Sequence, residues 1–252
     1  MRPSIERVRD FWESHVNNEY YTRAARGSAG YFQEIEERRY RHHYHLRPLF
    51  DRVAAAAPGG RLLEVGCGMG IDTLCLARRG FAEVVGVDLT ETAVAIARQR
   101  VADAGLENVR FEVADAERLD LPSERFDAVY SFGVIHHTPS TERAVAEIHR
   151  VLRPGGRAFV MVYHSRSLVA AVHELLRLPY ESPRNLRDHC PIVRRFTRRE
   201  ARALFGAFAE VTVETDYPFT YGMRAVSRFV PVGAQRRLGR AVGWHLLVEA
   251  RK

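Results

Sequence analysis

The chain has 252 residues and a formal net charge of +7 at neutral pH. Its 46% hydrophobic and 27% charged residues are ordinary for a globular protein with a full core. No apolar run reaches about 18 residues, which excludes a membrane-spanning helix. The N-terminal residues contain no apolar signal region, so we expect a cytoplasmic protein. The 3 cysteines form no Cys-x-x-Cys pair, and we expect reduced thiols and no metal site.

The positive charge comes largely from arginines that are scattered along the chain, with local clusters at residues 37–41 and 194–199. A basic chain can bind nucleic acid, an anionic metabolite or a membrane surface. Scattered arginines are more typical of solvated faces. We therefore expect exposed arginines, with nucleic-acid binding as the alternative interpretation.

Residues 1–57 are polar and aromatic, and their apolar residues recur at helical spacing, as in Ile5, Val8 and Phe11. The breaker at 58–60 (Pro-Gly-Gly) ends this segment. We expect it to form a helical lid over the remaining domain, residues 58–252. Three histidines at 42, 43 and 45 stand close together in the sequence, but on a helix they would point to different faces.

Strands alternate with helices from residue 61 onward, which predicts βαβ units and a parallel sheet with helices on both faces. After the fifth strand the alternation is interrupted twice, by segments at about 165–208 and 216–242 that we expect to cap a substrate site. Thr90 is expected to cap the helix that follows it. The expected strands are 61–65, 83–87, 109–113, 126–132, 157–163, 209–214 and 244–250, and a helix is expected over 142–152 before the stop signal at 153–156.

A glycine-rich turn follows the first of these strands, in the sequence E-V-G-C-G-M-G at 64–70. Gly66 and Gly68 allow the backbone to approach a ligand closely, and Gly70 permits tight packing at the helix start. The spacing differs from the dinucleotide fingerprint G-x-G-x-x-G. Glu64 places a carboxylate at the strand end, which suits a cationic ligand that carries an ammonium and a sulfonium.

Two further acidic residues follow the next two strands. Asp88 ends the second strand, where a carboxylate can accept hydrogen bonds from both hydroxyls of a ribose. Asp115 follows the third strand and can accept from an adenine amino group, while the Ala116 amide donates to the ring. The carboxyl ends of parallel strands meet at one edge, so we expect these loops to form one pocket. Helix capping is the alternative role for each aspartate.

Five blocks occur in order: E-V-G-C-G-M-G, V-V-G-V-D-L-T, A-D-A-E-R-L-D-L-P, R-F-D-A-V-Y-S-F-G-V-I-H-H-T and R-V-L-R-P-G-G-R. Together they resemble the class I S-adenosylmethionine (SAM)-dependent methyltransferases, and most closely the small-molecule branch that includes the ubiquinone/menaquinone C-methyltransferases. The match covers roughly residues 60–164 and the closing strands. It implies a Rossmann-like α/β fold with a seven-stranded sheet whose last strand is antiparallel.

The resemblance also implies which residues hold SAM and its product S-adenosylhomocysteine. The turn holds the methionine part, Asp88 and Leu89 hold the ribose and adenine, and 131–134 line the methionine end. Ala114 stands where many relatives have glycine, which is a mild departure. The cofactor residues expected are Tyr21, Glu64, Gly66, Cys67, Gly68, Gly70, Asp88, Leu89, Thr90, Asp115, Ala116, Ser131 and Phe132.

Methyl transfer from a sulfonium needs alignment and exclusion of water, and it needs a general base only if the acceptor arrives protonated. His136 and His137 follow the fourth strand beside the expected transfer site, and His164 ends the fifth strand at the same edge. These three histidines are the candidate catalytic bases. The alternative is that they pack within the core or cap the next helix.

The sequence thus predicts a SAM-dependent methyltransferase that acts on a small molecule, with specialised metabolism as one setting. The alternative is an RNA or DNA methyltransferase that uses the basic surface. It is disfavoured because S-F-G-V-I-H-H stands where many nucleic-acid enzymes carry N-P-P-Y or D-P-P-Y. A third hypothesis is a SAM-binding protein without catalysis. We expect a monomer or homodimer.

Overall fold

The structure is a computed structural model that describes residues 4–17, 19, 22–181 and 189–252. Its centre is one twisted sheet with the strand order β3-β2-β1-β4-β5-β8-β7, and the short strand β6 pairs with β5 beside this path. The strands are β1 (Arg61–Val65), β2 (Glu83–Asp88), β3 (Val109–Val113), β4 (Phe126–Phe132), β5 (Leu152–His164), β6 (Arg195–Phe196), β7 (Glu210–Asp216) and β8 (His245–Arg251).

β1 to β5 are parallel neighbours, whereas β8 runs antiparallel to both β5 and β7. This confirms the predicted Rossmann-like sheet of seven strands, whose last strand in the chain is antiparallel. The additional strand β6 pairs Arg195 and Phe196 with the final residues of β5. A strand of two residues has no periodicity for sequence analysis to detect, which is why it was not predicted.

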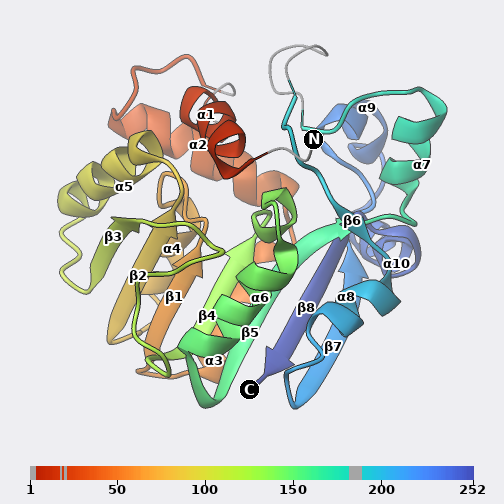
Figure 1. The fold of residues 1–252 in the computed structure, drawn as a ribbon. Coiled ribbons are helices and arrows are strands. Elements are labelled where there is room, and N and C mark those ends of the chain that lie inside the picture. Colours follow the sequence, from red (N-terminus) through yellow and green to blue (C-terminus); the bar gives the residue numbers. More distant parts are fainter. Residues whose placement is uncertain (1–3, 18, 20–21, 182–188) are drawn as a thin grey trace.

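Helices cover both faces of the sheet (Figure 1). The buried side chains of α3, α4 and α5 form one hydrophobic cluster with one face, and those of α6 and α8 form another with the opposite face. α1 and α2 lie above the ends of the strands. The helices are α1 (Ile5–Ser14), α2 (Ala29–His42), α3 (Leu46–Ala56), α4 (Ile71–Ala77), α5 (Glu91–Asp103), α6 (Thr141–Val151), α7 (Leu168–Leu175), α8 (Arg198–Leu204), α9 (Arg224–Ser227) and α10 (Val232–Val242).

β5 begins five residues earlier than predicted. The helix does stop before 153–156, but this segment is extended and belongs to the strand. The pairing with β4 shifts there: Phe126 lies opposite Leu152, whereas Ala128 lies opposite Arg157. The backbone of this bulge is still paired, since the Gly155 N–H donates to the Lys252 carbonyl over 2.9 Å. Proline and glycine therefore signal a bulge here as well as the end of the helix.

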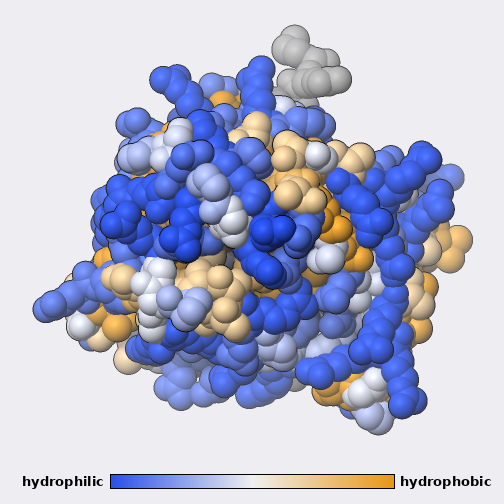
Figure 2. All heavy atoms as spheres, turned by 90° about the horizontal axis from the view of Figure 1, so that it is seen from below, coloured by the Kyte–Doolittle hydropathy of each residue, from blue (hydrophilic) through white to orange (hydrophobic). Residues whose placement is uncertain are grey.

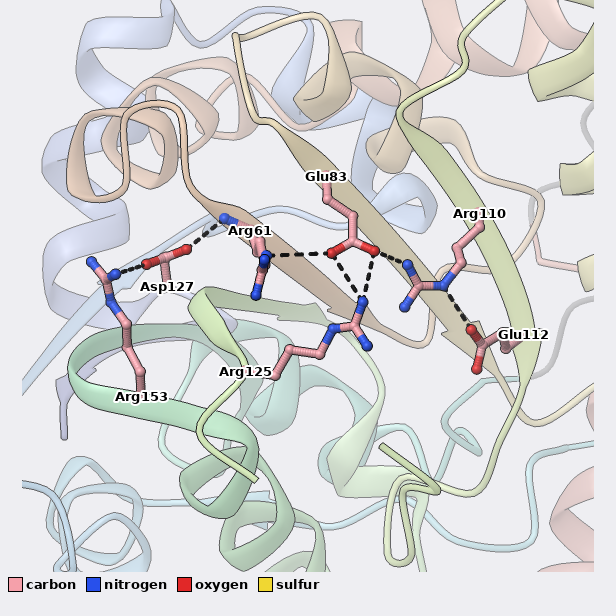
Figure 3. A network of polar contacts seen from close by, with 7 residues as sticks. All are labelled: Arg61, Glu83, Arg110, Glu112, Arg125, Asp127 and Arg153. Atoms are coloured by element: carbon pink, nitrogen blue, oxygen red, sulfur yellow. Dashed lines mark hydrogen bonds and ion pairs between the residues drawn. The ribbon is translucent and has the colours of Figure 1, made fainter. Parts of the chain in front are cut away.

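Arginines at the amino-terminal edge of the sheet are paired with acidic residues (Figure 3). Glu83 at the start of β2 forms ion pairs with Arg125 at 2.8 Å, with Arg61 at 3.7 Å and with Arg110. Asp127 on β4 pairs with Arg153 and accepts the Arg61 backbone N–H at 2.6 Å. This edge lies opposite the strand ends where the predicted pocket would form.

Figure 2 shows this side of the molecule as mainly hydrophilic, with small hydrophobic groups between the polar side chains. In the part of the chain that the structure describes, no helix is both long enough and apolar enough to cross a membrane.

The first helix is attached to α5 by one carboxylate. Glu13 at the end of α1 accepts the backbone N–H groups of Glu91 at 3.0 Å and Thr92 at 2.8 Å, and also the Thr92 hydroxyl. Thr90 is the N-cap residue, as predicted, but its side chain makes no cap hydrogen bond, because its hydroxyl donates to Asp88 at 2.8 Å. Glu13, distant in sequence, accepts the cap hydrogen bonds instead.

We predict that Glu13→Ala loosens α1 while the sheet keeps its stability. Loss of a helix cap costs about 1 kcal/mol, so amide exchange across 5–14 should accelerate roughly fivefold. Burial raises the pKa of Glu13, but the hydrogen bonds from Thr92 and Glu91 outweigh it and the pKa lies below 4.5. The attachment should therefore persist at neutral pH and weaken as the pH falls through that lowered value.

The measurement is hydrogen exchange followed by mass spectrometry. Asp10→Ala is the matched control, because Asp10 is an exposed acidic residue on the same helix. Equal protection of α1 in wild type and Glu13→Ala would contradict the assigned attachment.

Candidate active site

A cavity lies at the carboxyl-terminal edge of the parallel strands, where the sequence predicted a pocket. Its base is formed by the ends of β1, β2 and β4 and by the loop after β3, and Ile5, Val8 and Trp12 of α1 cover it. The predicted cofactor residues that line this cavity are Gly66, Gly68, Asp88, Leu89, Thr90, Asp115, Ala116 and Phe132.

The glycines of the turn have distinct roles. Gly66, Gly68 and Gly70 all have positive φ angles, 78°, 51° and 76°. A Cβ on Gly66 would lie 2.1 Å from Cγ2 of Val134, so only glycine fits beside the β4 end. A Cβ on Gly68 would meet nothing within 4 Å, which leaves this backbone open to the cavity. The turn is thus a cradle of exposed backbone that a ligand can approach closely.

Asp88 connects this turn to the next strand. Its Oδ2 accepts the Gly68 N–H at 2.8 Å, and its Oδ1 accepts the Thr90 N–H at 3.0 Å. Burial raises the pKa of Asp88, although these hydrogen bonds act in the opposite direction. The carboxylate lines the cavity next to the cradle, where ribose hydroxyls could reach it.

The loop after β3 forms the opposite wall. Oδ1 of Asp115 accepts the Glu117 N–H at 2.9 Å, which fixes the carboxylate at the cavity beside Ala116. Asp88 and Asp115 therefore line one cavity, as the strand order requires. Both also accept local turn hydrogen bonds. The segment after Asp115 forms a turn and no helix, so the helix-capping alternative does not apply to Asp115.

Glu64 lies below the turn and is almost fully buried. Its carboxylate accepts the Thr73 hydroxyl at 2.5 Å. Burial, and then the neighbouring charge of Asp72, raise the pKa of Glu64 well above its ordinary value. A small cavity joins Glu64 to Gly66 and Gly68, so a cationic group bound there would stabilise the ionised carboxylate. Cys67 also lines this space.

Arg39 of α2 lies on the far side of the same small cavity. Its guanidinium forms a two-pronged pair with Asp72, with Nε to Oδ1 at 2.7 Å. Tyr130 donates to the other carboxylate oxygen at 3.0 Å. The helix α2 is thus attached to the rest of the fold through a largely buried ion pair beside the turn.

A second cavity of about 370 Å³ adjoins the first. The two share walls formed by Trp12, Asn17, Phe132, Gly133 and His137. Six aromatic residues line the second cavity, together with four histidines. Sequence analysis did not assign Trp12 or Asn17 to the site, because their position depends on how α1 folds over the strands. The aromatic residues are Trp12, Phe132, Tyr163, Tyr180, Tyr217 and Trp244.

His137 stands at the junction of the two cavities. Its Nδ1 lies 2.7 Å from the Ile192 carbonyl oxygen, which can only accept a hydrogen bond. The proton is therefore on Nδ1, and Nε2 carries a lone pair. Burial lowers the pKa of His137 below 6.5, so the ring is neutral at neutral pH. These properties are those of a general base.

The other predicted catalytic histidines do not line either cavity. His136 is fully buried against Tyr163, with ring centroids 4.0 Å apart. His164 is also buried, and its Nδ1 lies 3.0 Å from the Gly243 carbonyl oxygen. Ser131, predicted at the methionine end, points into the core and lines neither cavity. Tyr21 lies outside the described residues.

Two histidines of the early cluster meet a third from the last strand. His43 ends α2 and His45 precedes α3, so the helical spacing assumed for them does not apply. His45 Nε2 lies 3.1 Å from Nδ1 of His245, and the His43 ring stacks on Tyr217 at 4.6 Å. Burial lowers the pKa of all three rings, so they are neutral. His43 and His245 line the second cavity, and His45 packs against both of them.

Comparison with known proteins agrees with this geometry. Residues 63–160 match a family model described as a methyltransferase domain. A phosphatidylethanolamine N-methyltransferase from Cereibacter sphaeroides is 37% identical over 123 residues, which are 48% of this chain and 60% of that protein. A 27-O-demethylrifamycin SV methyltransferase from Amycolatopsis mediterranei is 38% identical over 113 residues, 43% of this chain and 42% of that protein. The chain thus spans about half the length of these relatives.

The crystal structure of a SAM-dependent methyltransferase from Thermotoga maritima has a TM-score of 0.65 at 22% identity and covers 97% of this chain and 99% of that one. The fold is therefore that of the class I methyltransferases. The part that matches the methyltransferase domain model contains the glycine turn, Asp88 and Asp115.

We predict that Asp88→Ala weakens SAM binding by more than about tenfold, or roughly 1.4 kcal/mol. The variant removes the carboxylate expected to bind the ribose and also frees the Gly68 N–H from its acceptor. Titration calorimetry measures the affinity. Asp51→Ala, which removes an exposed carboxylate that pairs with Arg79, is the control. Unchanged SAM affinity in Asp88→Ala would show that the site assignment is wrong.

Proposed function

We propose that this chain transfers a methyl group from SAM to a small-molecule acceptor held in the aromatic cavity. The observation that carries the proposal is the shared wall between the two cavities, at the end of β4. An acceptor in the second cavity would lie next to the methionine end of a cofactor in the first. Such adjacency supplies the alignment that methyl transfer requires.

The residues present suit this cofactor. Gly66 to Gly70 give an open backbone cradle, Glu64 offers a carboxylate to an ammonium group, and Asp88 and Asp115 offer carboxylates to the ribose and adenine. SAM supplies a methyl group activated on sulfur: the acceptor–methyl bond forms as the carbon–sulfur bond breaks, and its electron pair stays on sulfur. The chain excludes water by placing α1 over the cavity.

His137 is the group that we propose to accept a proton from the acceptor. Its neutral ring lies at the junction of the cavities and presents Nε2, while the Ile192 carbonyl fixes the tautomer. His136 and His164 would instead position neighbouring elements, because both are buried away from the cavities.

Relatives support a small acceptor and leave its reacting atom open. The names of the two curated relatives specify a nitrogen of a lipid and an oxygen of an antibiotic precursor, and the sequence blocks resemble quinone C-methyltransferases. For this chain we propose only the class of acceptor, a small molecule, with specialised metabolism as one setting. A geranyl diphosphate C-methyltransferase from Streptomyces coelicolor shares the fold at a TM-score of 0.64.

Nucleic-acid methylation, the alternative, draws support from the net charge of +7. The geometry favours it less, because the aromatic cavity is small and Arg39, an arginine on its wall, is already paired with Asp72. The experiment is incubation with methyl-labelled SAM and a cell extract split by ultrafiltration. Label in a filtrate metabolite is expected; label confined to RNA or DNA would establish the alternative, and SAM binding without any labelled product would indicate a non-catalytic protein.

We predict that His137→Gln lowers kcat about 100-fold for an acceptor that must lose a proton, with SAM affinity within about twofold of wild type. The rate should fall at acidic pH, through a pKa below 6.5, because the protonated ring cannot accept a proton. His149→Gln is the control, because His149 lies on α6, edge to face against Phe208 and outside both cavities. A wild-type rate in His137→Gln would remove the base from the mechanism.

A further inference from the structure

The aromatic cavity is walled by stacked rings. Tyr163 stacks on Trp244 with centroids 4.3 Å apart, and Tyr180 stacks on the same indole at 5.5 Å. Tyr217 stacks on His245 at 4.5 Å from the other side. The stacked rings give the cavity an apolar wall, and ring faces that stay uncovered can attract a cation. The Tyr180 ring already has one, since the Arg195 guanidinium lies 4.5 Å from its centroid.

Two charged residues line this cavity, and they differ in how they are compensated. Arg39 is neutralised by its two-pronged pair with Asp72. Glu181 accepts a hydrogen bond from the Tyr163 hydroxyl, and within the described ranges no cationic side chain forms an ion pair with it. The neighbouring Arg195 pairs with Glu174 at 2.7 Å. Among the described residues, Glu181 is therefore a carboxylate of this cavity that forms no ion pair.

Three of the four histidines that line the cavity carry no positive charge. Burial lowers the pKa of His43, His137 and His245, so all three rings are neutral at neutral pH. An uncompensated carboxylate at an aromatic wall costs free energy, which a ligand cation would recover. The charge of Glu181 also acts on His137 and opposes the lowering of its pKa, so the carboxylate and the base face a common space.

From the juxtaposition of Glu181 with the stacked rings of Tyr163, Tyr180 and Trp244, we propose that the methyl acceptor is an amine. It binds as an ammonium cation, with its charge toward Glu181 and the aromatic faces. This rests on the proposed function and specifies the substrate class of the same cavity.

The ammonium form has no lone pair and cannot accept a methyl group. One N–H proton passes to Nε2 of His137, and the N–H electron pair stays on the amine nitrogen. That pair then forms the new nitrogen–carbon bond as the methyl group leaves sulfur. The product is a methylated ammonium ion, and the imidazolium of His137 returns its proton to solvent.

The test compares two probes of the same shape, phenethyltrimethylammonium and its uncharged tert-butyl analogue, by titration calorimetry with S-adenosylhomocysteine present. The permanent cation should bind about tenfold more tightly than the neutral analogue to the wild-type protein. In Glu181→Gln this preference should largely disappear through loss of cation affinity, while the affinity for the analogue stays the same.

Glu174→Gln is the matched control, because Glu174 is an exposed carboxylate nearby that does not line the cavity. Its preference for the cation should equal that of wild type. Thermal melting checks that both variants fold. If Glu181→Gln does not fold, Glu181→Asp takes its place, and its preference for the cation should be smaller than that of wild type. Equal binding of the two probes to wild type, or an undiminished preference in a folded Glu181 variant, overturns the proposal.

The outcome is separable from that of the proposed function. A cation preference that depends on Glu181, without methyl transfer to any metabolite, would contradict the methyltransferase activity and leave the cation site in place. A labelled product that carries its methyl group on a molecule without a basic nitrogen would overturn the amine proposal and leave the methyltransferase activity in place.

Discussion

The close approach of the turn after β1 to the ends of its two neighbouring strands is the constraint on which the site depends. The N–H groups of Gly66 and Cys67 both donate to the Val87 carbonyl, at 2.7 and 2.9 Å, so the turn folds back over β2. On the β4 side, Val134 leaves no space for a Cβ at Gly66. The chain can make this turn only with glycine, and the turn then exposes Gly68 and orients Asp88.

Three acidic residues surround the same turn. Glu64, Asp72 and Asp88 lie around it, and burial raises the pKa of both Glu64 and Asp88. The guanidinium of Arg39 compensates Asp72. The carboxylates of Glu64 and Asp88 favour a cationic ligand, because burial removes their solvation and neither forms an ion pair with a described residue. A sulfonium with an ammonium group matches this environment better than a phosphate would, and this matches the cofactor of the domain family.

The strands could be predicted from the sequence, because they depend on local patterns, and the same patterns place the ends of β1 to β4 at one edge. Parallel strands of five to seven residues alternate with helices, so Asp88 and Asp115 must reach one edge. Contacts over long separations were not predictable. Glu13 accepts the first N–H groups of α5, which the Thr90 side chain does not. His245 meets His45 only because β8 inserts beside β5. For the same reason sequence analysis treated His136 and His137 alike, although the turn after β4 brings only His137 to the cavities.

The net charge is a weak guide to the partner of this protein. At the amino-terminal edge, Arg61, Arg110 and Arg125 share Glu83, and this arginine-rich edge lies across the sheet from both cavities (Figure 3). In the aromatic cavity, by contrast, Glu181 forms no ion pair with a described residue. The walls of this cavity come from α1, from the segment around Tyr180 and from the segment around Tyr217, three regions separate from the glycine turn. The acceptor site can therefore carry a charge preference opposite to that of the whole chain, because different segments determine the cavity and the surface.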